Sequence, residues 1–215
     1  MAYQVHEVFY TLQGEGAQSG RPAVFCRFAG CNLWSGREQD RSQAVCRFCD
    51  TQFVGTGGPG GGRFESARLL AAHIESFWPA GEARHRFTVL TGGEPLLQVD
   101  EALTEELHRR RFQIAVETNG TLPAPRGLDW ICVSPKAGAT WVLRSGDELK
   151  LVYPQPGLMP QDIVRAGGGA EFRHWWLQPM DGPEISENTR RAVQHCLSEP
   201  RWRLSLQTHK FIGIA

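Results

Sequence analysis

Apolar residues recur along this chain at two different spacings, which alternate from residue 64 onward. Leu69, Leu70, Ile74 and Phe77 recur at helical intervals, together with His73, and predict a helix. Short apolar runs predict buried strands between helical patterns or long polar connections, and these runs span residues 23–28, 86–90, 113–117, 130–134, 148–153, 174–178 and 202–206. Strands separated in this way form βαβ units, which place neighbouring strands parallel.

These units predict an α/β fold, in which about six strands form a partial, open parallel β/α barrel with an extended loop that carries cysteines. There are too few units for the eight strands of a closed barrel. The 215 residues are enough for one sizeable core and short for two. We therefore expect a single domain over residues 1–215.

Two further helices are predicted later in the chain. Asp100 is a candidate N-cap for a helix that carries Leu103 and Leu107. A later helix is expected to place four apolar residues on one side, namely Ala192, Val193, Cys196 and Leu197.

Polar residues follow the predicted strands at the points where these strands end. The residues are Thr91, Glu117, Thr118, Ser134, Gln178, Gln207 and His209. The carboxyl ends of the strands of a parallel α/β barrel form one rim, and this rim holds the active site. Ordinary loop polarity accounts for some of these residues one by one, and His209 also suits a buried core position. Their repetition after five strands favours a site at the rim.

Composition and charge exclude several classes of partner. The 23 basic and 23 acidic side chains balance, so no overall field attracts the chain to nucleic acid or to an anionic membrane. The apolar stretches are far too short to span a bilayer. Residues 1–10 contain His6 and Glu7 and lack the basic-then-apolar pattern of a leader. Six cysteines in such a chain indicate reduced thiols, and we expect a cytoplasmic protein.

Three of these cysteines are close together in the sequence, with the spacing Cys31-x14-Cys46-x2-Cys49. A structural zinc site normally closes with four ligands, whereas three thiolates leave one iron of an iron–sulfur cluster open. An open iron can hold a small molecule and pass it an electron. The cysteine spacing therefore favours a cluster with one open iron.

A zinc site completed by Cys26 is the first alternative, and unrelated thiols are the second. Alternation along residues 23–28 places Cys26 on the strand face that carries Val24 and Phe28. A residue in mid-strand that points away from the loop is a poor fourth ligand. The spacing by itself does not exclude either alternative.

Two neighbouring features suit the binding of small charged groups. In TGGEP (91–95) the paired glycines permit close approach of a ligand, and Glu94 can accept hydrogen bonds from an ammonium group, although a plain glycine turn explains this segment equally well. Arg27 is predicted to point into the barrel, where a substrate carboxylate is a natural partner. The alternative is an internal ion pair with Glu15 or Glu117, and Glu117 is also a candidate partner of Lys136.

Several short motifs occur together and in a fixed order. They are EVFYTLQGEG (7–16), the cysteine loop followed by Asp50 and Thr51, TGGEP (91–95), ETNG (117–120), SPK (134–136), QPM (178–180) and QTHK (207–210). In this combination, from about residue 5 to the C-terminus, the chain resembles the radical S-adenosylmethionine (SAM) superfamily and, within it, the 7-carboxy-7-deazaguanine synthase family. The superfamily usually spaces its cysteines C-x3-C-x2-C, and here fourteen residues replace the first three. Some members of this synthase family have such an extended loop.

The resemblance implies a role for each matching residue. Cys31, Cys46 and Cys49 would bind three irons of a [4Fe–4S] cluster, and the fourth iron would take the amino and carboxylate groups of SAM. The residues implied to bind SAM are Phe48, Cys49, Asp50, Gly93, Glu94, Ser134, Pro135, Lys136, Gln178, Pro179, Met180 and Asp181. Those implied to bind the substrate are Leu12, Gln13, Gly14, Arg27 and Thr91. Thr51 would be a Mg²⁺ ligand, with further oxygens supplied by the substrate.

The same resemblance implies an activity. The enzyme would be a carbon–nitrogen lyase that converts 6-carboxy-5,6,7,8-tetrahydropterin to 7-carboxy-7-deazaguanine with loss of ammonia, a step of queuosine and other deazapurine biosynthesis. A 5′-deoxyadenosyl radical would abstract a hydrogen atom from the substrate. Flavodoxin or ferredoxin would supply the electron, and the enzyme would be a homodimer. A radical SAM activase of another protein and a zinc-binding adaptor without enzymatic activity are the alternatives.

Overall fold

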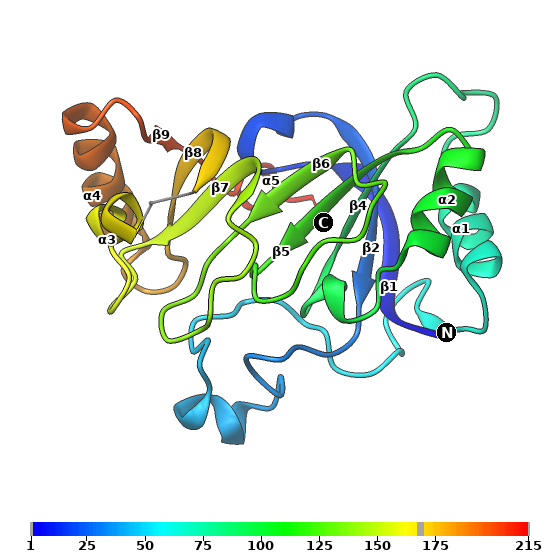
Figure 1. Ribbon diagram of the computed structural model, residues 1–215, viewed down its shortest axis with the longest axis horizontal. Helices are drawn as coiled ribbons and strands as arrows, with labels where there is room; N and C mark the ends of the chain where they lie inside the picture. Colours follow the sequence, from blue (N-terminus) through cyan, green and yellow to red (C-terminus); the bar gives the residue numbers. More distant parts are fainter. Residues whose placement is uncertain (1, 167–169, 215) are drawn as a thin grey trace.

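The computed structural model describes residues 2–166 and 170–214, and its centre is one mixed sheet of nine strands (Figure 1). Within the described residues the strand order is β3-β1-β2-β4-β5-β6-β7-β8-β9. The strands are β1 (Tyr3–Leu12), β2 (Pro22–Phe28), β3 (Gly62–Phe64), β4 (Phe87–Gly92), β5 (Gln113–Thr118), β6 (Trp130–Val133), β7 (Ser145–Tyr153), β8 (Glu171–Pro179) and β9 (Arg203–Leu204). The last pairing along this order is β8 with β9, so the sheet remains open.

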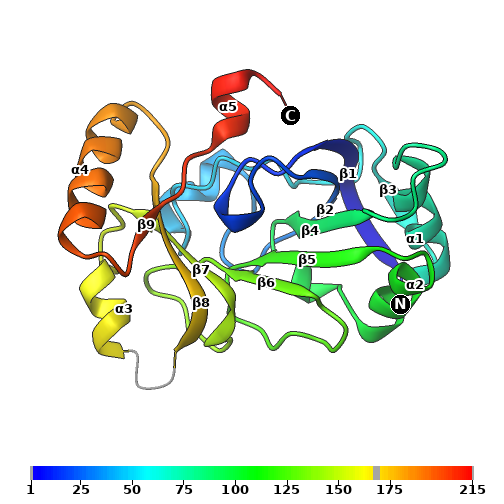
Figure 2. The same ribbon diagram turned by 90° about the horizontal axis from the view of Figure 1, so that it is seen from above.

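Five α-helices flank the sheet within the described residues (Figure 2). They are α1 (Ala67–Ser76), α2 (Glu101–Arg109), α3 (Pro160–Ala166), α4 (Ile185–Ser198) and α5 (Thr208–Ile212). The helices α1 and α2 lie at one end of the sheet and α3 and α4 at the other, whereas α5 stands apart from both pairs. In the described part of the chain, no helix combines the length and the apolar character that crossing a membrane requires.

The predicted α/β fold with an open, largely parallel sheet is confirmed. Consecutive parallel pairings run from β2·β4 to β8·β9 and make seven parallel strands, close to the expected six. The strands β1 and β3 were not predicted as part of the sheet, and they extend it by antiparallel pairing beyond β2. A β-bulge between Val5 and Glu7 shifts the alternation along β1, which removes the regular period that would have revealed this strand.

The helix predictions are confirmed at α2 and only in part at α4. The Asp100 carboxylate accepts a hydrogen bond from the Leu103 backbone N–H at 3.0 Å and caps α2 as expected. In α4, Ala192 is fully buried, but Leu197 is 79% exposed. Val193 is also exposed, at 37%, so the four apolar residues expected on one side of this helix are only partly covered, and Leu197 lies in its last turn.

Each parallel strand presents two chemically different faces. On the face toward α1 and α2, Val24, Cys26 and Phe28 of β2 are fully buried in the larger core cluster. On the opposite face, the residues near the beginnings of β2, β4 and β5 form a small apolar cluster that includes Val89. Farther along this second face, the residues become polar, as at Arg27. On this second face, the residues are therefore apolar near the beginnings of the strands and polar toward their carboxyl ends.

Candidate active site

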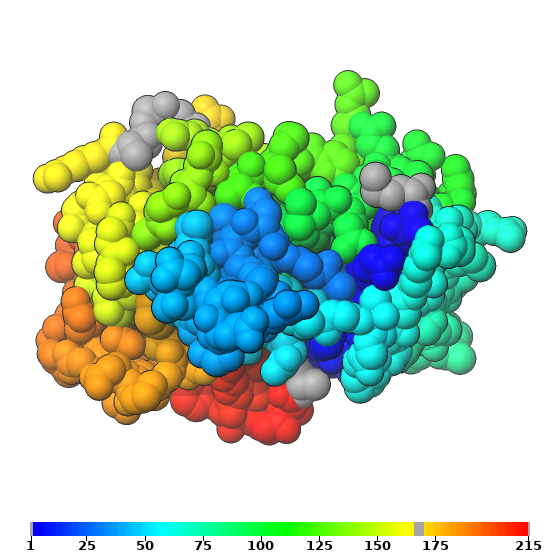
Figure 3. All heavy atoms as spheres, turned by 90° about the horizontal axis from the view of Figure 1, so that it is seen from below, coloured from blue at the N-terminus to red at the C-terminus, as the bar shows by residue number. Residues whose placement is uncertain are grey.

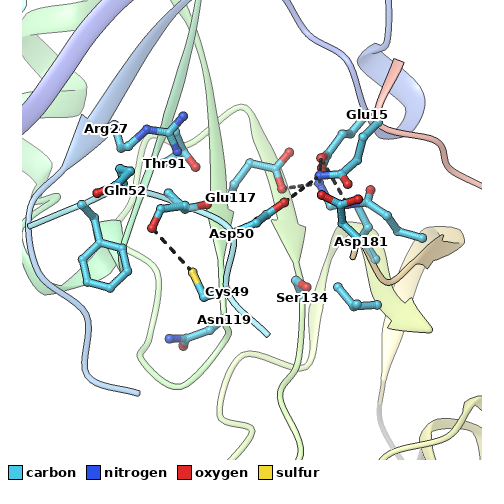
Figure 4. Close-up of a pocket in the computed structure, with 18 of the residues that line it drawn as sticks. Glu15, Arg27, Cys49, Asp50, Gln52, Thr91, Glu117, Asn119, Ser134 and Asp181 are labelled. Carbon is cyan, nitrogen blue, oxygen red and sulfur yellow. Dashed lines mark hydrogen bonds and ion pairs between the residues drawn. The ribbon is translucent and has the colours of Figure 1, made fainter. Parts of the chain in front are cut away.

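A cavity of about 510 Å³ opens at the carboxyl ends of the parallel strands. Figure 4 shows the side chains of its wall, with Arg27 and Thr91 at one side and Glu15 and Asp181 at the other. Most of the predicted site residues line this cavity, namely Leu12, Gln13, Gly14, Arg27, Cys31, Cys46, Phe48, Cys49, Asp50, Thr51, Thr91, Gly93, Ser134, Lys136, Gln178, Pro179, Met180 and Asp181. The polar strand ends predicted to form one rim therefore meet at one cavity. Glu94 and Pro135 do not belong to its lining.

The fourteen residues between Cys31 and Cys46 form an outward loop whose two ends meet at Leu33. The carbonyl oxygen of Leu33 accepts hydrogen bonds from the backbone N–H groups of Val45, at 3.1 Å, and Cys46, at 3.3 Å. The chain thus returns to its starting point before Cys46. For this reason the long spacing still brings Cys46 to the same cavity wall as Cys31 and Cys49.

All three cysteines of the loop are free thiols on this wall. Burial raises the pKa of Cys31 and of Cys46, so binding of a metal centre must displace a proton from each. Cys26 is fully buried in the core on the opposite strand face, which removes it as the fourth ligand of a zinc site. Within residues 2–166 and 170–214, no group of three or more His, Cys, Asp or Glu side chains is close enough to hold a single metal ion. In a cubane cluster each thiolate binds its own iron, and three separate thiols on one wall fit that requirement.

The TGGEP segment packs against the start of the cysteine loop. A Cβ atom at Gly93 would lie 2.0 Å from the carbonyl oxygen of Gly30, so only glycine permits this approach. The backbone N–H of Glu94 donates to the same oxygen at 2.9 Å. The glycine therefore serves a backbone contact beside Cys31, in addition to any contact with a ligand.

The Glu94 carboxylate is fully buried and turned toward the protein. It accepts hydrogen bonds from the hydroxyl of Thr118 at 2.7 Å and from the backbone N–H groups of Asn119 and Leu96 at 2.8 and 2.9 Å. Burial raises the pKa of Glu94, although these donors oppose the shift. In this structure Glu94 holds the ETNG turn against β4, and its contact with an amino group stays a prediction about the loaded site.

Ser134 and Lys136 lie together on the wall that follows β6. The Lys136 ammonium donates to the carbonyl and to the hydroxyl of Ser134, at 2.6 and 2.7 Å. Burial lowers the pKa of Lys136. The suggested pairing of Lys136 with Glu117 is wrong, because Glu117 pairs with Lys150 instead.

A charge cluster around the buried Lys150 forms part of the cavity wall. The Lys150 ammonium lies 2.5 Å from a carboxylate oxygen of Glu15 and 2.8 Å from one of Glu117. The side-chain amides of Gln178 and Gln207 each donate to the other Glu15 oxygen at 3.1 Å. Burial alone would raise the pKa of Glu15, but Lys150 and these donors outweigh burial and lower it. The Lys150 ammonium therefore lies between two acidic side chains, Glu15 and Glu117.

On the part of the wall that is predicted to bind the substrate, the Arg27 guanidinium has only one of its donors in a hydrogen bond within residues 2–166 and 170–214. Arg27 donates through Nε to Glu7 at 2.7 Å, so the internal partner is Glu7 and not Glu15 or Glu117. In the described residues this is the one hydrogen bond of the guanidinium. Its terminal nitrogens are thus available to an anion in the cavity, beside Thr91 (Figure 4).

The C-terminal helix α5 covers the cavity from the side of residue 14. A Cβ at Gly14 would lie 2.2 Å from Nδ1 of His209, so this glycine is required for the approach of α5. Burial lowers the pKa of His209, which favours the neutral ring. Lys210 bridges two predicted SAM-binding residues, with 2.6 Å to Asp50 and 2.6 Å to Asp181. Lys210 therefore links α5 to both edges of the cavity.

We expect Lys210→Ala to raise the KM for SAM by less than about tenfold, because exposed ion pairs contribute about 0.2–1 kcal/mol each. The melting temperature should change little for the same reason. Steady-state kinetics of Lys210→Ala beside Arg190→Ala measures this, since Arg190 pairs with exposed Glu187 on α4. An unchanged KM for SAM in Lys210→Ala would show that the bridge does not support the cofactor wall.

Sequence reasoning missed Lys150 and Lys210 as residues of the site. Lys150 carried the clearer signal, because it is a charged residue between Leu149 and Leu151 in the predicted strand 148–153, on the same strand face as Glu148. Lys210 belongs to the QTHK motif, but its partners Asp50 and Asp181 are distant in sequence.

Comparison with known proteins agrees with this geometry. Residues 41–144 match the family model of the radical SAM superfamily. Two curated relatives, both named 7-carboxy-7-deazaguanine synthase, come from Bradyrhizobium diazoefficiens and Burkholderia multivorans. They are 62% and 58% identical to this chain over 214 residues, with 100% of both chains covered. The crystal structure of QueE from Escherichia coli superposes with a TM-score of 0.70 at 30% identity, covering 97% of this chain and 95% of that chain.

Proposed function

The chain belongs to the 7-carboxy-7-deazaguanine synthase family of the radical SAM superfamily, and from this we propose how its cavity carries out the reaction. It is a radical SAM enzyme of deazapurine (queuosine) biosynthesis and a lyase that acts on a small molecule. Neither the activase nor the zinc-binding adaptor is favoured. The substrate in our proposal is 6-carboxy-5,6,7,8-tetrahydropterin, and the products are 7-carboxy-7-deazaguanine and ammonia. The observation that carries the proposal is one cavity lined by three free cysteines and a guanidinium.

The family implies a [4Fe–4S] cluster and SAM, and the residues of the cavity fit both. Cys31, Cys46 and Cys49 would hold the cluster, and Cys26 is too far inside the core to complete a fourth ligand. When bound, the two groups supply 5′-deoxyadenosyl radical chemistry. The positive Lys136 ammonium and the polar strand ends, among them Ser134 and Gln178, would orient the polar groups of SAM beside the cysteines.

The opposite part of the cavity suits a pterin with a carboxylate. Arg27 would bind the carboxylate through its terminal nitrogens while Glu7 fixes Nε. A pterin also has amino and ring N–H donors, and the partly buried Glu15 and Glu117 offer acceptors for them in the cavity wall. Lys150 lowers the pKa of Glu15, because its positive charge offsets the cost of burying that carboxylate.

Several finer assignments are part of the same proposal. Thr51 lines the cavity next to Cys49 and would contribute its hydroxyl to a Mg²⁺ ion that also takes oxygens of the substrate. A flavodoxin or ferredoxin would donate the electron, and the enzyme would act as a homodimer in the cytoplasm. One continuous sheet supports the assignment of residues 1–215 to a single domain.

We expect Arg27→Ala to raise the KM for the pterin about 30- to 150-fold, because a hydrogen bond to a charged group contributes about 2–3 kcal/mol. The KM for SAM should stay within twofold, since Arg27 lies on the substrate side. Arg27→Lys keeps the charge without the fork and should recover part of the loss. Steady-state kinetics with each substrate varied in turn measures both constants. Equal KM values for the pterin in Arg27→Ala and wild type would remove Arg27 from the substrate site.

The proposed function is tested by anaerobic turnover. Reconstituted protein is incubated with SAM, dithionite and 6-carboxytetrahydropterin, and the mixture is analysed by mass spectrometry. We expect 7-carboxy-7-deazaguanine to appear with stoichiometric ammonia. Unchanged pterin in the presence of an intact cluster would contradict the proposed substrate.

A further inference from the structure

The outward loop between Cys31 and Cys46 is organised around Arg41 and Trp34. The Arg41 guanidinium lies 4.1 Å from the centre of the Trp34 ring, in a cation–π arrangement. Trp34 is buried and packs edge-on against Phe53, with 5.6 Å between ring centres. Its indole N–H donates to the carbonyl of Arg37 at 3.2 Å. Trp34 therefore offers Arg41 a fixed surface.

Arg41 donates hydrogen bonds to the backbone near the third cysteine and to Glu38. Its Nη1 donates to the carbonyl of Arg47 at 2.9 Å and to that of Cys49 at 3.1 Å. Its Nε donates to both carboxylate oxygens of Glu38, at 2.9 and 2.8 Å, at the start of the short 3₁₀ helix Glu38–Gln43. One side chain thus joins the outward loop to both carbonyls that flank Phe48.

The turn from Cys46 to Cys49 has few hydrogen bonds of its own backbone. Within the described residues, the segment from residue 47 to 52 makes no backbone–backbone hydrogen bond. The nearest such bond on its N-terminal side is that of the Cys46 N–H to Leu33. The two hydrogen bonds from Arg41 therefore hold the carbonyls of Arg47 and Cys49, whereas Gln207 and Lys210 hold the side chain of Asp50 that follows.

We propose that Arg41 is a positioning residue, which braces the turn from Cys46 to Cys49 in the conformation that receives the cluster. The fourteen-residue loop between Cys31 and Cys46 would then stabilise the positions of the cysteines that bind the cluster. Figure 3 shows this loop, in blue, on the outside of the molecule beside the C-terminal segment in red. The proposal rests on the proposed function, because it assigns the cluster to these cysteines.

The chemistry of the contact requires arginine. A guanidinium can stack on Trp34, pair with Glu38 and donate to two carbonyls at once, because its donors lie in one rigid plane. A lysine ammonium has a single point charge and cannot make this set of contacts in the same position. Arg41→Lys should therefore retain only part of the support that Arg41 gives to the turn from Cys46 to Cys49, and Arg41→Ala should retain none.

The test compares Arg41→Ala, Arg41→Lys and Arg37→Ala with the wild type. Arg37 is a matched control, because it lies exposed in the same loop and its side chain makes no hydrogen bond or ion pair in the described residues. In the protein without metal, limited chymotrypsin digestion reports cleavage after Phe48. In the reconstituted protein, anaerobic transfer of iron to a chelator reports retention of the cluster, and the spectrum of the reduced cluster reports its ligand geometry.

We expect Arg41→Ala to be cleaved about tenfold faster after Phe48 and to release iron about tenfold faster, because residues that orient metal ligands typically change affinity 10- to 100-fold. Arg41→Lys should lie between Arg41→Ala and the wild type, and Arg37→Ala should match the wild type. Wild-type cleavage and iron release in Arg41→Ala would overturn the proposal. If circular dichroism shows that Arg41→Ala does not fold, the rates of cleavage after Phe48 and of iron release in Arg41→Lys decide the outcome instead. A wild type that binds no iron would contradict the proposed function, while cleavage of the metal-free chain still tests the brace.

Discussion

Replacement of Cys46 by alanine is expected to abolish product formation and to reduce bound iron from about four per chain to nearly none, because a [4Fe–4S] cluster needs each thiolate of its ligand set. Cys46 is 6% exposed, and the loss of one buried methyl-sized group should lower the free energy of unfolding by about 1 kcal/mol only. Iron analysis and the turnover assay on anaerobically reconstituted protein measure the first effect. Urea unfolding measures the second.

Cys26→Ala is the matched control for this experiment. Cys26 is fully buried in the core, so its replacement should cost a similar free energy of unfolding. Its iron content and turnover should remain those of the wild type. If Cys26→Ala loses the metal and Cys46→Ala keeps it, the assignment of the ligands is wrong.

Replacement of Lys150 by methionine is expected to lower the free energy of unfolding by about 3–5 kcal/mol at pH 8, because it removes the positive charge that pairs with the partly buried Glu15 and Glu117 side chains. Product formation should also be lost, since this part of the cavity wall would lose its only neighbouring ammonium among the residues of the cluster. Urea unfolding at pH 8 measures the stability. The double variant Glu15→Gln/Lys150→Met, which removes one carboxylate together with the ammonium, should recover part of it.

The pH dependence of the Lys150→Met variant should be opposite in sign to that of the wild type. In the wild type the pKa of Glu15 lies below its ordinary value of 4.5, so Glu15 contributes stability at neutral pH that is lost as the pH falls through the lowered pKa. Without Lys150, burial raises this pKa above 4.5, and the folded state binds the proton more tightly than the unfolded state.

The stability of Lys150→Met should therefore fall as the pH rises from about 4.5 toward neutrality. The difference from the wild type should be smaller at pH 5 than at pH 8. Unfolding by urea at both pH values provides the measurement. A difference that is equal at the two pH values would mean that Lys150 does not control the ionisation of these carboxylates.

The parallel part of the fold and most of the cavity wall could be predicted from the sequence. The apolar runs placed β2 and β4 to β9, and the polar residues after them, such as Thr91 and Ser134, do meet at one rim. Alternation along β2 correctly placed Cys26 in the core and Arg27 on the cavity side. These features repeat with a period of two, which the sequence displays directly.

The remaining features depend on contacts between residues that no local period connects. The bulge in β1 concealed that strand and with it Glu7, which is the partner of Arg27. The pairing of Lys150 with Glu15 joins residues 135 positions apart. The outward loop has its shape from Arg41 and Trp34, and loops of this kind have no spacing rule that would predict such a contact.

In the proposed site, three cysteines hold a cluster whose one open iron takes SAM. Low-temperature electron paramagnetic resonance of the dithionite-reduced protein, before and after addition of SAM, is the sharpest test of this site. We predict the signal of a reduced [4Fe–4S] cluster, with g values that change when SAM is added. A protein that is silent in this measurement and contains one zinc per chain would contradict the account.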